Sequence, residues 1–204
     1  MDNTLLSSRI DFDRMKEEIY DFFCSKNIFD GQVEFCNHTV STLLQKAKTS
    51  NDLTEETYKA VWSIIEKIEK EGMEDADLEP DVVETLEKLY PNYFLVILTN
   101  NSFEASISAL NRNSIKNYFS EVVTRDHITE LKPSPTGILY ILRKYSELAR
   151  NKWTMVGDSW IDGKAAADGG IDFIGYKIDA EDLKDKGIMT KYSIESLREL
   201  LQYV

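Results

Sequence analysis

Two patterns of hydrophobic positions divide the chain near residue 75. From about residue 13 to residue 72, apolar side chains recur every three or four positions, which is the period of amphipathic helices. The first of these helices carries four such residues, Met15, Ile19, Phe22 and Phe23. A second helix is predicted around Val40–Leu44. A third is predicted to begin near Asp52, which can cap it, with Glu55 three residues later completing a capping box. This part of the chain is therefore predicted to be helical throughout.

After Pro80, short apolar runs alternate with amphipathic stretches. The apolar runs, which predict buried strands, are Tyr93–Leu98, Val122–Val123, Trp153–Val156 and Ile171–Gly175. Helices are predicted over residues 81–90, 103–112, 135–149, 162–168 and 193–202. Apolar runs that do not alternate, separated by helices, indicate a parallel sheet covered on both faces. The predicted fold class is α/β, with a doubly wound, Rossmann-like parallel-sheet core and an inserted α-helical segment.

The charge balance excludes two classes of partner. The 204 residues include 24 Lys and Arg against 36 Asp and Glu, which gives a formal net charge of −12. Such an acidic surface repels the phosphate backbone of nucleic acids and anionic membrane surfaces, so neither is an expected partner. A local cluster of donors can still attract a small phosphorylated molecule against this background.

The N-terminus and the cysteines predict the compartment. Met1-Asp2-Asn3-Thr4 is neither basic nor apolar, unlike a signal peptide, and the longest apolar run, Tyr93–Leu98, has only six residues. The two cysteines, Cys24 and Cys36, lack zinc-ligand spacing and cannot build a disulfide framework. We therefore expect two reduced thiols in a cytoplasmic protein.

Two of the predicted strands are followed by residues that can bind an anion. Ligands of parallel sheets bind at the carboxyl ends of the strands, so the residues that follow each apolar run are the candidate site residues. Thr99 and Asn100 follow the first run, before a helix whose N-terminal amides can hold an anion; the alternative is that Thr99 caps this helix. After the second run, Lys132 lies between Leu131 and Pro133, and two prolines fix its backbone. It can neutralise phosphate charge, the alternative being a solvated surface lysine.

An acidic pair follows the third run. Gly157 allows a tight turn, Asp158 lies at the strand end and Asp162 one helical turn further, so both carboxylates can face one point. Their repulsion is relieved by a divalent cation such as Mg²⁺, which prefers carboxylates and water. The alternatives are a helix cap by Asp158 with a solvated Asp162, or a serine esterase built on Ser159, which lacks a suitably spaced histidine. Thr, Lys and an acidic pair, in that order, form a phosphoryl-transfer constellation, whereas a receiver domain has its acidic pair near the N-terminus.

These motifs resemble those of the haloacid dehalogenase superfamily, specifically its phosphatases with a helical cap inserted after the first motif. Thr99 matches the second motif, Lys132 in Lys-Pro-Ser-Pro the third, and the stretch from Gly157 to Asp162 the fourth. The resemblance covers essentially the whole chain. It assigns residues 1–12 and 76–204 to the α/β core domain and residues 13–75 to the cap, which in relatives closes over the substrate and selects it.

The first motif of this family is only half present. It is an apolar strand that ends in Asp-x-Asp-x-Thr, and Asp2-Asn3-Thr4 matches its second half, so the nucleophilic aspartate would stand just before Met1. Asp11 and Asp13 offer an alternative pair, but they follow a poor buried strand and Asp13 suits a helix cap. The missing strand occupies the middle of the sheet in relatives, and its absence would leave two neighbouring strands unpaired. We therefore expect the natural reading frame to start upstream of Met1, or another segment to fill the gap.

The resemblance implies a Mg²⁺-dependent phosphatase of small phosphorylated metabolites that forms an aspartyl-phosphate intermediate. Asp2 would be its general acid and base, and the Asp2 carbonyl would hold the metal with Asp158 and Asp162. Three groups would stabilise the transferring phosphoryl group, namely Thr99, the Asn100 amide and Lys132. A phosphomutase would use Asp2 in the same way, whereas the acidic pair disfavours a dehalogenase, which needs no metal. The alternative from another class is a non-catalytic binding or regulatory protein on this scaffold, lacking the nucleophile.

Overall fold

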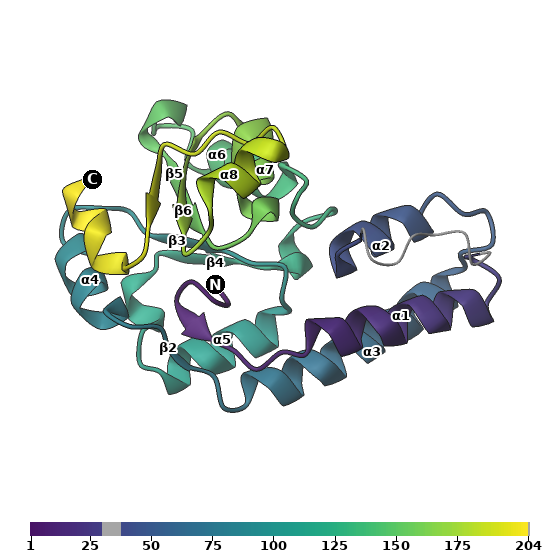
Figure 1. The fold of residues 1–204 in the computed structure, drawn as a ribbon. Coiled ribbons are helices and arrows are strands. Elements are labelled where there is room, and N and C mark those ends of the chain that lie inside the picture. The colour runs from purple at the N-terminus through teal and green to yellow at the C-terminus, as the bar shows by residue number, and fades with distance from the viewer. Residues whose placement is uncertain (30–37, 204) are drawn as a thin grey trace. The chain divides into compact units, whose positions relative to one another are not determined.

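The computed structural model describes residues 1–29 and 38–203, which form two compact units (Figure 1). The core unit comprises Met1–Ser8 and Ala76–Val204, and the helical unit comprises Arg9–Asp75. The segment predicted as a cap begins at residue 13, a few residues inside the helical unit. Of the two cysteines, Cys24 is free, and Cys36 lies outside the described residues.

The helical unit is built from amphipathic helices, as its hydrophobic period predicted. Helix α1 (Phe12–Ser25) contacts both α2 (Val40–Ala47) and α3 (Glu55–Met73). The buried positions recur at helical spacing on the inner faces, among them Met15, Ile19 and Phe23 of α1 and Val61, Ile65 and Ile68 of α3.

Two helix starts differ from those predicted. Asp11, not Asp13, caps α1, and its carboxylate accepts a hydrogen bond from the Arg14 N–H at 2.9 Å. Thr54, not Asp52, caps α3, and its hydroxyl accepts one from the Thr57 N–H at 3.1 Å. In each case the cap is the last non-helical residue whose side chain reaches the first free amides of the helix. Asp11 and Asp13 are both exposed at the start of α1, so they do not form an acidic pair at the end of a strand.

The core unit has an α/β fold with parallel strands, which confirms the predicted fold class. Strand β3 (Val96–Leu98) pairs in parallel with β4 (Glu121–Val123). Strand β6 (Asp172–Tyr176) pairs in parallel with both β5 (Thr154–Gly157) and β7 (Tyr192–Ile194). A small antiparallel pair, β1 (Leu6–Ser7) with β2 (Asp77–Leu78), lies where the chain leaves and re-enters this unit.

The helices of the core unit follow the predicted alternation with three local differences, the first being a short helix over residues 180–185 that was not predicted. The helices are α4 (Val82–Leu89), α5 (Phe103–Arg112), α6 (Thr136–Lys144), α7 (Trp160–Gly169) and α8 (Ala180–Asp185). Helix α6 ends five residues before the predicted end at residue 149. The helix predicted over residues 193–202 is instead strand β7 followed by a 3₁₀ helix (Leu197–Gln202), because Ser196 breaks the run and caps the second element.

One hydrophobic core joins the two pieces of parallel sheet. Leu98 and Val123, from β3 and β4, belong to the same buried cluster as Phe173 of β6 and Ile138 of α6. Within the described residues, however, β3 pairs only with β4, and β5 pairs only with β6. No helix among these residues is both long and apolar enough to cross a membrane.

Candidate functional site

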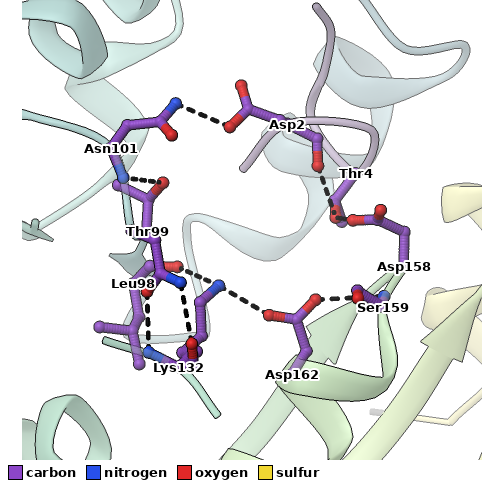
Figure 2. A network of polar contacts seen from close by, with 10 residues as sticks. Asp2, Thr4, Leu98, Thr99, Asn101, Lys132, Asp158, Ser159 and Asp162 are labelled. Atoms are coloured by element: carbon purple, nitrogen blue, oxygen red, sulfur yellow. Dashed lines mark hydrogen bonds and ion pairs between the residues drawn. The ribbon is translucent and has the colours of Figure 1, made fainter. Parts of the chain in front are cut away.

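The predicted site residues converge at the carboxyl ends of β3 and β5. The N-terminal turn, the loop after β3, the loop before α6 and the start of α7 each contribute polar side chains to one network (Figure 2). Its members are Asp2, Thr4, Thr99, Asn101, Lys132, Asp158 and Asp162. Segments far apart in the sequence therefore meet at the sheet edge where parallel sheets bind ligands.

The N-terminal turn holds Asp2 and Thr4 in place. The Met1 carbonyl accepts hydrogen bonds from the N–H groups of Leu5 at 2.8 Å and Leu6 at 3.1 Å, which closes the turn. Asn3 has φ 51°, a left-handed conformation that Asn tolerates better than most residues. Thr4 is buried, and its hydroxyl donates to Oδ1 of Asp158 at 2.6 Å. This bond ties the turn to the end of β5.

Asp2 combines a fixed oxygen with a free one. Its Oδ2 accepts a hydrogen bond from Nδ2 of Asn101 at 2.7 Å. Its Oδ1 is buried and has no hydrogen-bond partner among the described residues. Withdrawal from water raises the pKa of Asp2 above its ordinary value, against the opposing effects of the Met1 ammonium, Asn101 and Lys132. A carboxyl group held in this way is suited to exchange a proton with a bound molecule.

Lys132 is buried and paired, not a solvated surface lysine. Its side chain is 8% exposed, and its ammonium lies 2.6 Å from Oδ1 of Asp162, whose side chain is 7% exposed. The same ammonium donates to the Leu98 carbonyl at 3.3 Å. Asn100 clamps the Lys132 backbone on both sides, because its Nδ2 donates to the Lys132 carbonyl at 3.0 Å and its Oδ1 accepts from the Lys132 N–H at 2.9 Å. The positive charge is thus fixed in position at the site.

The acidic pair divides into one engaged and one accessible carboxylate. Both oxygens of Asp162 are engaged, because Oδ2 accepts from the Ser159 N–H at 3.2 Å while Oδ1 meets Lys132. Asp158 is half-buried, and burial raises the pKa of its carboxyl, an effect that the Thr4 hydrogen bond opposes. Ser159, not Asp158, is the N-cap of α7, so the capping alternative with a solvated Asp162 is wrong. The esterase alternative lacks its histidine as well, because no hydrogen bond joins Ser159 to a histidine among the described residues, where His38 bonds to Thr42 and His127 to Thr124.

Thr99 has a buried hydroxyl that does not cap the following helix. Ser102 caps α5 instead, and its hydroxyl accepts from the Ala105 N–H at 3.3 Å. The Thr99 hydroxyl accepts from the Asn101 N–H at 3.2 Å, while the Thr99 N–H donates to the Val123 carbonyl at 2.9 Å. The loop that Thr99 opens is therefore anchored to β4.

Two members of the network were not among the predicted site residues. Thr4 links the N-terminal turn to Asp158, and Asn101 positions Asp2. Thr4 stands in the half motif Asp2-Asn3-Thr4, which was a usable signal. For Asn101 the only signal was a second asparagine directly after Asn100 at the end of a strand.

The Asn100 clamp gives a first testable prediction. Asn100→Ala removes both hydrogen bonds to the Lys132 backbone and is expected to lower the free energy of unfolding by about 1–3 kcal/mol, because polar groups of the loop lose their partners. Urea unfolding followed by circular dichroism measures the change. The matched control is Asn92→Ala at an exposed position, which is expected to change stability by less than about 0.5 kcal/mol. Equal stability of both variants would show that Asn100 does not hold the loop.

The oxygen donors around Asp158 suit a small hard cation. One hydroxyl, Oγ1 of Thr4, lies 2.6 Å from Oδ1 of Asp158 and 3.4 Å from the Asp2 carbonyl oxygen, so these two oxygens share one neighbourhood. Within the described residues no three His, Cys, Asp or Glu side chains gather as a ligand cluster. Mg²⁺ does not need such a cluster, because it binds through one or two carboxylates and keeps several waters. The donor set therefore fits Mg²⁺ better than a softer metal.

Comparison with known proteins gives a family match over most of the chain. A family model described as haloacid dehalogenase-like hydrolase matches residues 1–176. Among curated proteins, a phosphoglycolate phosphatase of Aliivibrio fischeri is 35% identical over 96 residues, which are 47% of this chain and 42% of that protein. The chain spans about half the length of the curated relatives that it matches, from 42% to 57%.

Solved structures with the same fold cover the whole chain. A predicted phosphoglycolate phosphatase from Haemophilus somnus 129PT has a TM-score of 0.67 at 23% identity, over 100% of this chain and 94% of that one. A HAD-hydrolase from Bacillus subtilis bound to magnesium has a TM-score of 0.63 at 18% identity, over 100% of this chain and 95% of that one. At these identities the likeness shows a shared fold.

Proposed function

Because the chain belongs to the haloacid dehalogenase-like hydrolases, we propose that it is a Mg²⁺-dependent phosphatase of small phosphorylated metabolites. One observation carries this proposal, namely the meeting of Asp2, Thr99, Lys132 and Asp158 at a single sheet edge. The buried lysine that Asp162 holds in place and the Asp2 carboxyl group with its unpartnered oxygen together support transfer of an anionic group and a proton.

The residues divide the chemistry among them. By the register of Asp2-Asn3-Thr4, the attacking carboxylate belongs to the residue before Met1; its oxygen bonds to phosphorus while the bond from phosphorus to the substrate oxygen breaks. Asp2 gives its proton to the departing oxygen and then takes one from the water that hydrolyses the aspartyl phosphate. Lys132 and the Thr99 hydroxyl stabilise the charge on the phosphoryl oxygens, together with the Asn100 backbone amide.

The proposed metal site uses Asp158 and the Asp2 carbonyl as direct ligands. Mg²⁺ bound there would neutralise charge on the phosphoryl oxygens. Asp162 acts as the partner of Lys132 in this scheme, because both of its oxygens are already engaged, and it completes the metal site only if the ion pair opens.

The curated relatives support one class of substrate to test first. Those relatives are phosphoglycolate phosphatases, so small phosphorylated carboxylic acids are the first compounds to test. A phosphomutase would need the same four residues, and it differs in returning the phosphoryl group to a second sugar or acid instead of to water. Release of inorganic phosphate separates these two activities.

Hydrolysis of p-nitrophenyl phosphate, with and without Mg²⁺, tests the proposal. It should be measured on this chain and on a version lengthened before Met1 by an apolar strand that ends in aspartate. We expect Mg²⁺-dependent release of phosphate by the lengthened version, and loss of that activity when the added aspartate is asparagine. Activity in neither version would favour a non-catalytic binding protein on this scaffold.

Metal binding can be tested without an activity measurement. Mg²⁺ is expected to raise the melting temperature of the chain by several degrees, roughly 2–4 °C per kcal/mol of binding free energy at this size. Asp158→Asn is expected to abolish the increase, because it removes the accessible carboxylate. Asp168→Asn, which alters an exposed carboxylate paired with Lys164, serves as the control and should retain it. A full Mg²⁺ effect in Asp158→Asn would place the metal elsewhere.

A further inference from the structure

The polar network of the site continues into the turn that follows β4. Asn101, whose side chain holds Asp2 (Figure 2), is buried, and its backbone carbonyl accepts a hydrogen bond from the Arg125 N–H at 3.2 Å. Arg125 opens a short 3₁₀ helix (Arg125–His127) that begins two residues after the end of β4. The loops at the carboxyl ends of β3 and β4 are therefore joined through Asn101.

Three hydrogen bonds, made by alternate residues of the loop after β3, join this loop to β4 and its turn. They run from the Thr99 N–H to the Val123 carbonyl at 2.9 Å, from the Arg125 N–H to the Asn101 carbonyl at 3.2 Å, and from the Phe103 N–H to Oδ2 of Asp126 at 2.6 Å. The first two join backbone groups, as the ladder between β3 and β4 does. In the third bond the carboxylate of Asp126 takes the place of a backbone carbonyl. Asp126 therefore extends the connection between the two loops by one further step.

The turn after β4 fixes the position of Asp126. Thr124 is fully buried, its N–H donates to Nδ1 of His127 at 3.2 Å, and the His127 N–H donates to the Thr124 carbonyl at 3.0 Å. These reciprocal bonds form a capping box that closes the turn around Asp126. The Thr124 hydroxyl also donates to Oδ2 of Asp126 at 3.4 Å, the same oxygen that accepts from the Phe103 N–H. Both the backbone and the carboxylate of Asp126 are thus held in place.

Asp126 contributes an acceptor to the start of α5. The Phe103 N–H is the first amide of this helix, and Ser102 accepts from the Ala105 N–H two residues further on. The free amides at a helix N-terminus carry partial positive charge, which favours a carboxylate there. A hydrogen bond to a charged oxygen is also stronger than one between neutral groups. Both effects favour the bond between Asp126 and Phe103, although both residues are exposed to solvent.

We propose that Asp126 is a positioning residue for Asp2 and acts on it through Asn101. The loop from Thr99 to Phe103 is held at both ends and in its middle, where Asn101 directs its Nδ2 to Oδ2 of Asp2 at 2.7 Å. Loss of the Asp126 carboxylate releases one end of this loop, so the Asn101 side chain is no longer fixed in the orientation that holds Asp2. The consequence for turnover rests on the proposed function, whereas the orientation of Asn101 does not.

The residues proposed to bind the phosphoryl group have anchors of their own. The Thr99 N–H donates to the Val123 carbonyl, and the Asn100 side chain makes two hydrogen bonds to the Lys132 backbone. Loss of the Asp126 bond is therefore expected to disturb Asn101 more than Thr99 or Asn100, and to affect the proton transfer by Asp2 more than the binding of substrate.

Nuclear magnetic resonance of the 204-residue chain tests the positioning role without an activity measurement. Asp126→Ala removes the acceptor, whereas Asp126→Asn keeps an acceptor oxygen; the control, Glu104→Ala, removes an exposed carboxylate from the first turn of the same helix. In Asp126→Ala, hydrogen exchange of the Phe103 amide is expected to be about tenfold faster. The side-chain amide signals of Asn101, identified by their loss in Asn101→Asp, are expected to move toward those of a solvent-exposed asparagine. Asp126→Asn and Glu104→Ala should keep the Phe103 exchange rate and the Asn101 signals of the original chain.

Steady-state kinetics give the second arm, in whichever version of the chain hydrolyses p-nitrophenyl phosphate. Asp126→Ala is expected to lower kcat about tenfold and to leave KM within about twofold, and Asp126→Asn should restore kcat to within about twofold of the original. Faster exchange of the Phe103 amide with unchanged Asn101 signals would show that Asp126 only caps α5, and would overturn the proposal. Equal effects of Asp126→Ala and Asp126→Asn would also overturn it, because the charge and not the hydrogen bond would then matter. If no version hydrolyses the substrate, the proposed function fails, and the Asn101 signals still decide the positioning role.

Discussion

Replacing Lys132 by methionine is expected to destabilise the protein by about 3–5 kcal/mol. The substitution keeps most of the side-chain volume and removes the charge that pairs with Asp162 at 2.6 Å. The Asp162 side chain, which is 7% exposed, would then be a buried carboxylate whose remaining hydrogen bond comes from the Ser159 N–H. Equilibrium unfolding in urea, followed by circular dichroism, measures the loss.

The double variant Lys132→Met with Asp162→Asn separates the charge effect from packing. With both charges removed, stability should return to within about 1–2 kcal/mol of the original chain, because a neutral buried pair carries no uncompensated charge. If the double variant is no more stable than Lys132→Met alone, the cause is lost packing around Lys132 and not the unpaired carboxylate.

Replacing Asp2 by asparagine is expected to lower kcat for phosphate release by about 10²–10⁴-fold, in whichever version of the chain hydrolyses p-nitrophenyl phosphate. Asparagine keeps an oxygen that can accept the Asn101 hydrogen bond, so the turn is preserved. It cannot give or take the proton that the departing oxygen and the attacking water require. Steady-state kinetics at saturating Mg²⁺ measure the effect.

Two controls show whether the Asp2 effect is chemical. The increase in melting temperature caused by Mg²⁺ should survive in Asp2→Asn, because the proposed metal ligand from this residue is its backbone carbonyl. Asp13→Asn, at an exposed position of the helical unit, should leave kcat unchanged. An unchanged kcat in Asp2→Asn would show that Asp2 takes no part in the reaction.

The positions of the strand-end residues could be predicted from the sequence because the apolar runs are unambiguous. The run that ends at Leu98 and the run that ends at Val156 are both followed directly by polar residues, and parallel strands bring such residues to one edge. Prediction was weakest where a short polar side chain decides the local structure. By residue type Asp52 is the better cap, and only the backbone conformation selects Thr54.

The different roles of Asp158 and Asp162 could not be predicted from the sequence. Spacing placed Asp158 and Asp162 on one side of a helix start, but it did not show that Lys132 lies between β3 and α7 and engages one of them. The side-chain roles of the asparagines were hidden for a similar reason. Asn100 and Asn101 are identical by type and adjacent, yet one clamps the Lys132 backbone and the other holds Asp2.

The most direct test of the phosphoryl site is calorimetric titration of the 204-residue chain with inorganic phosphate in the presence of Mg²⁺. We expect binding at one site, lost in the Lys132→Met, Asp162→Asn double variant, which removes the fixed positive charge while the fold is preserved. The Asn92→Ala variant should bind phosphate as the original chain does. Absence of phosphate binding, or equal binding by the double variant, would contradict a phosphoryl site built on Lys132.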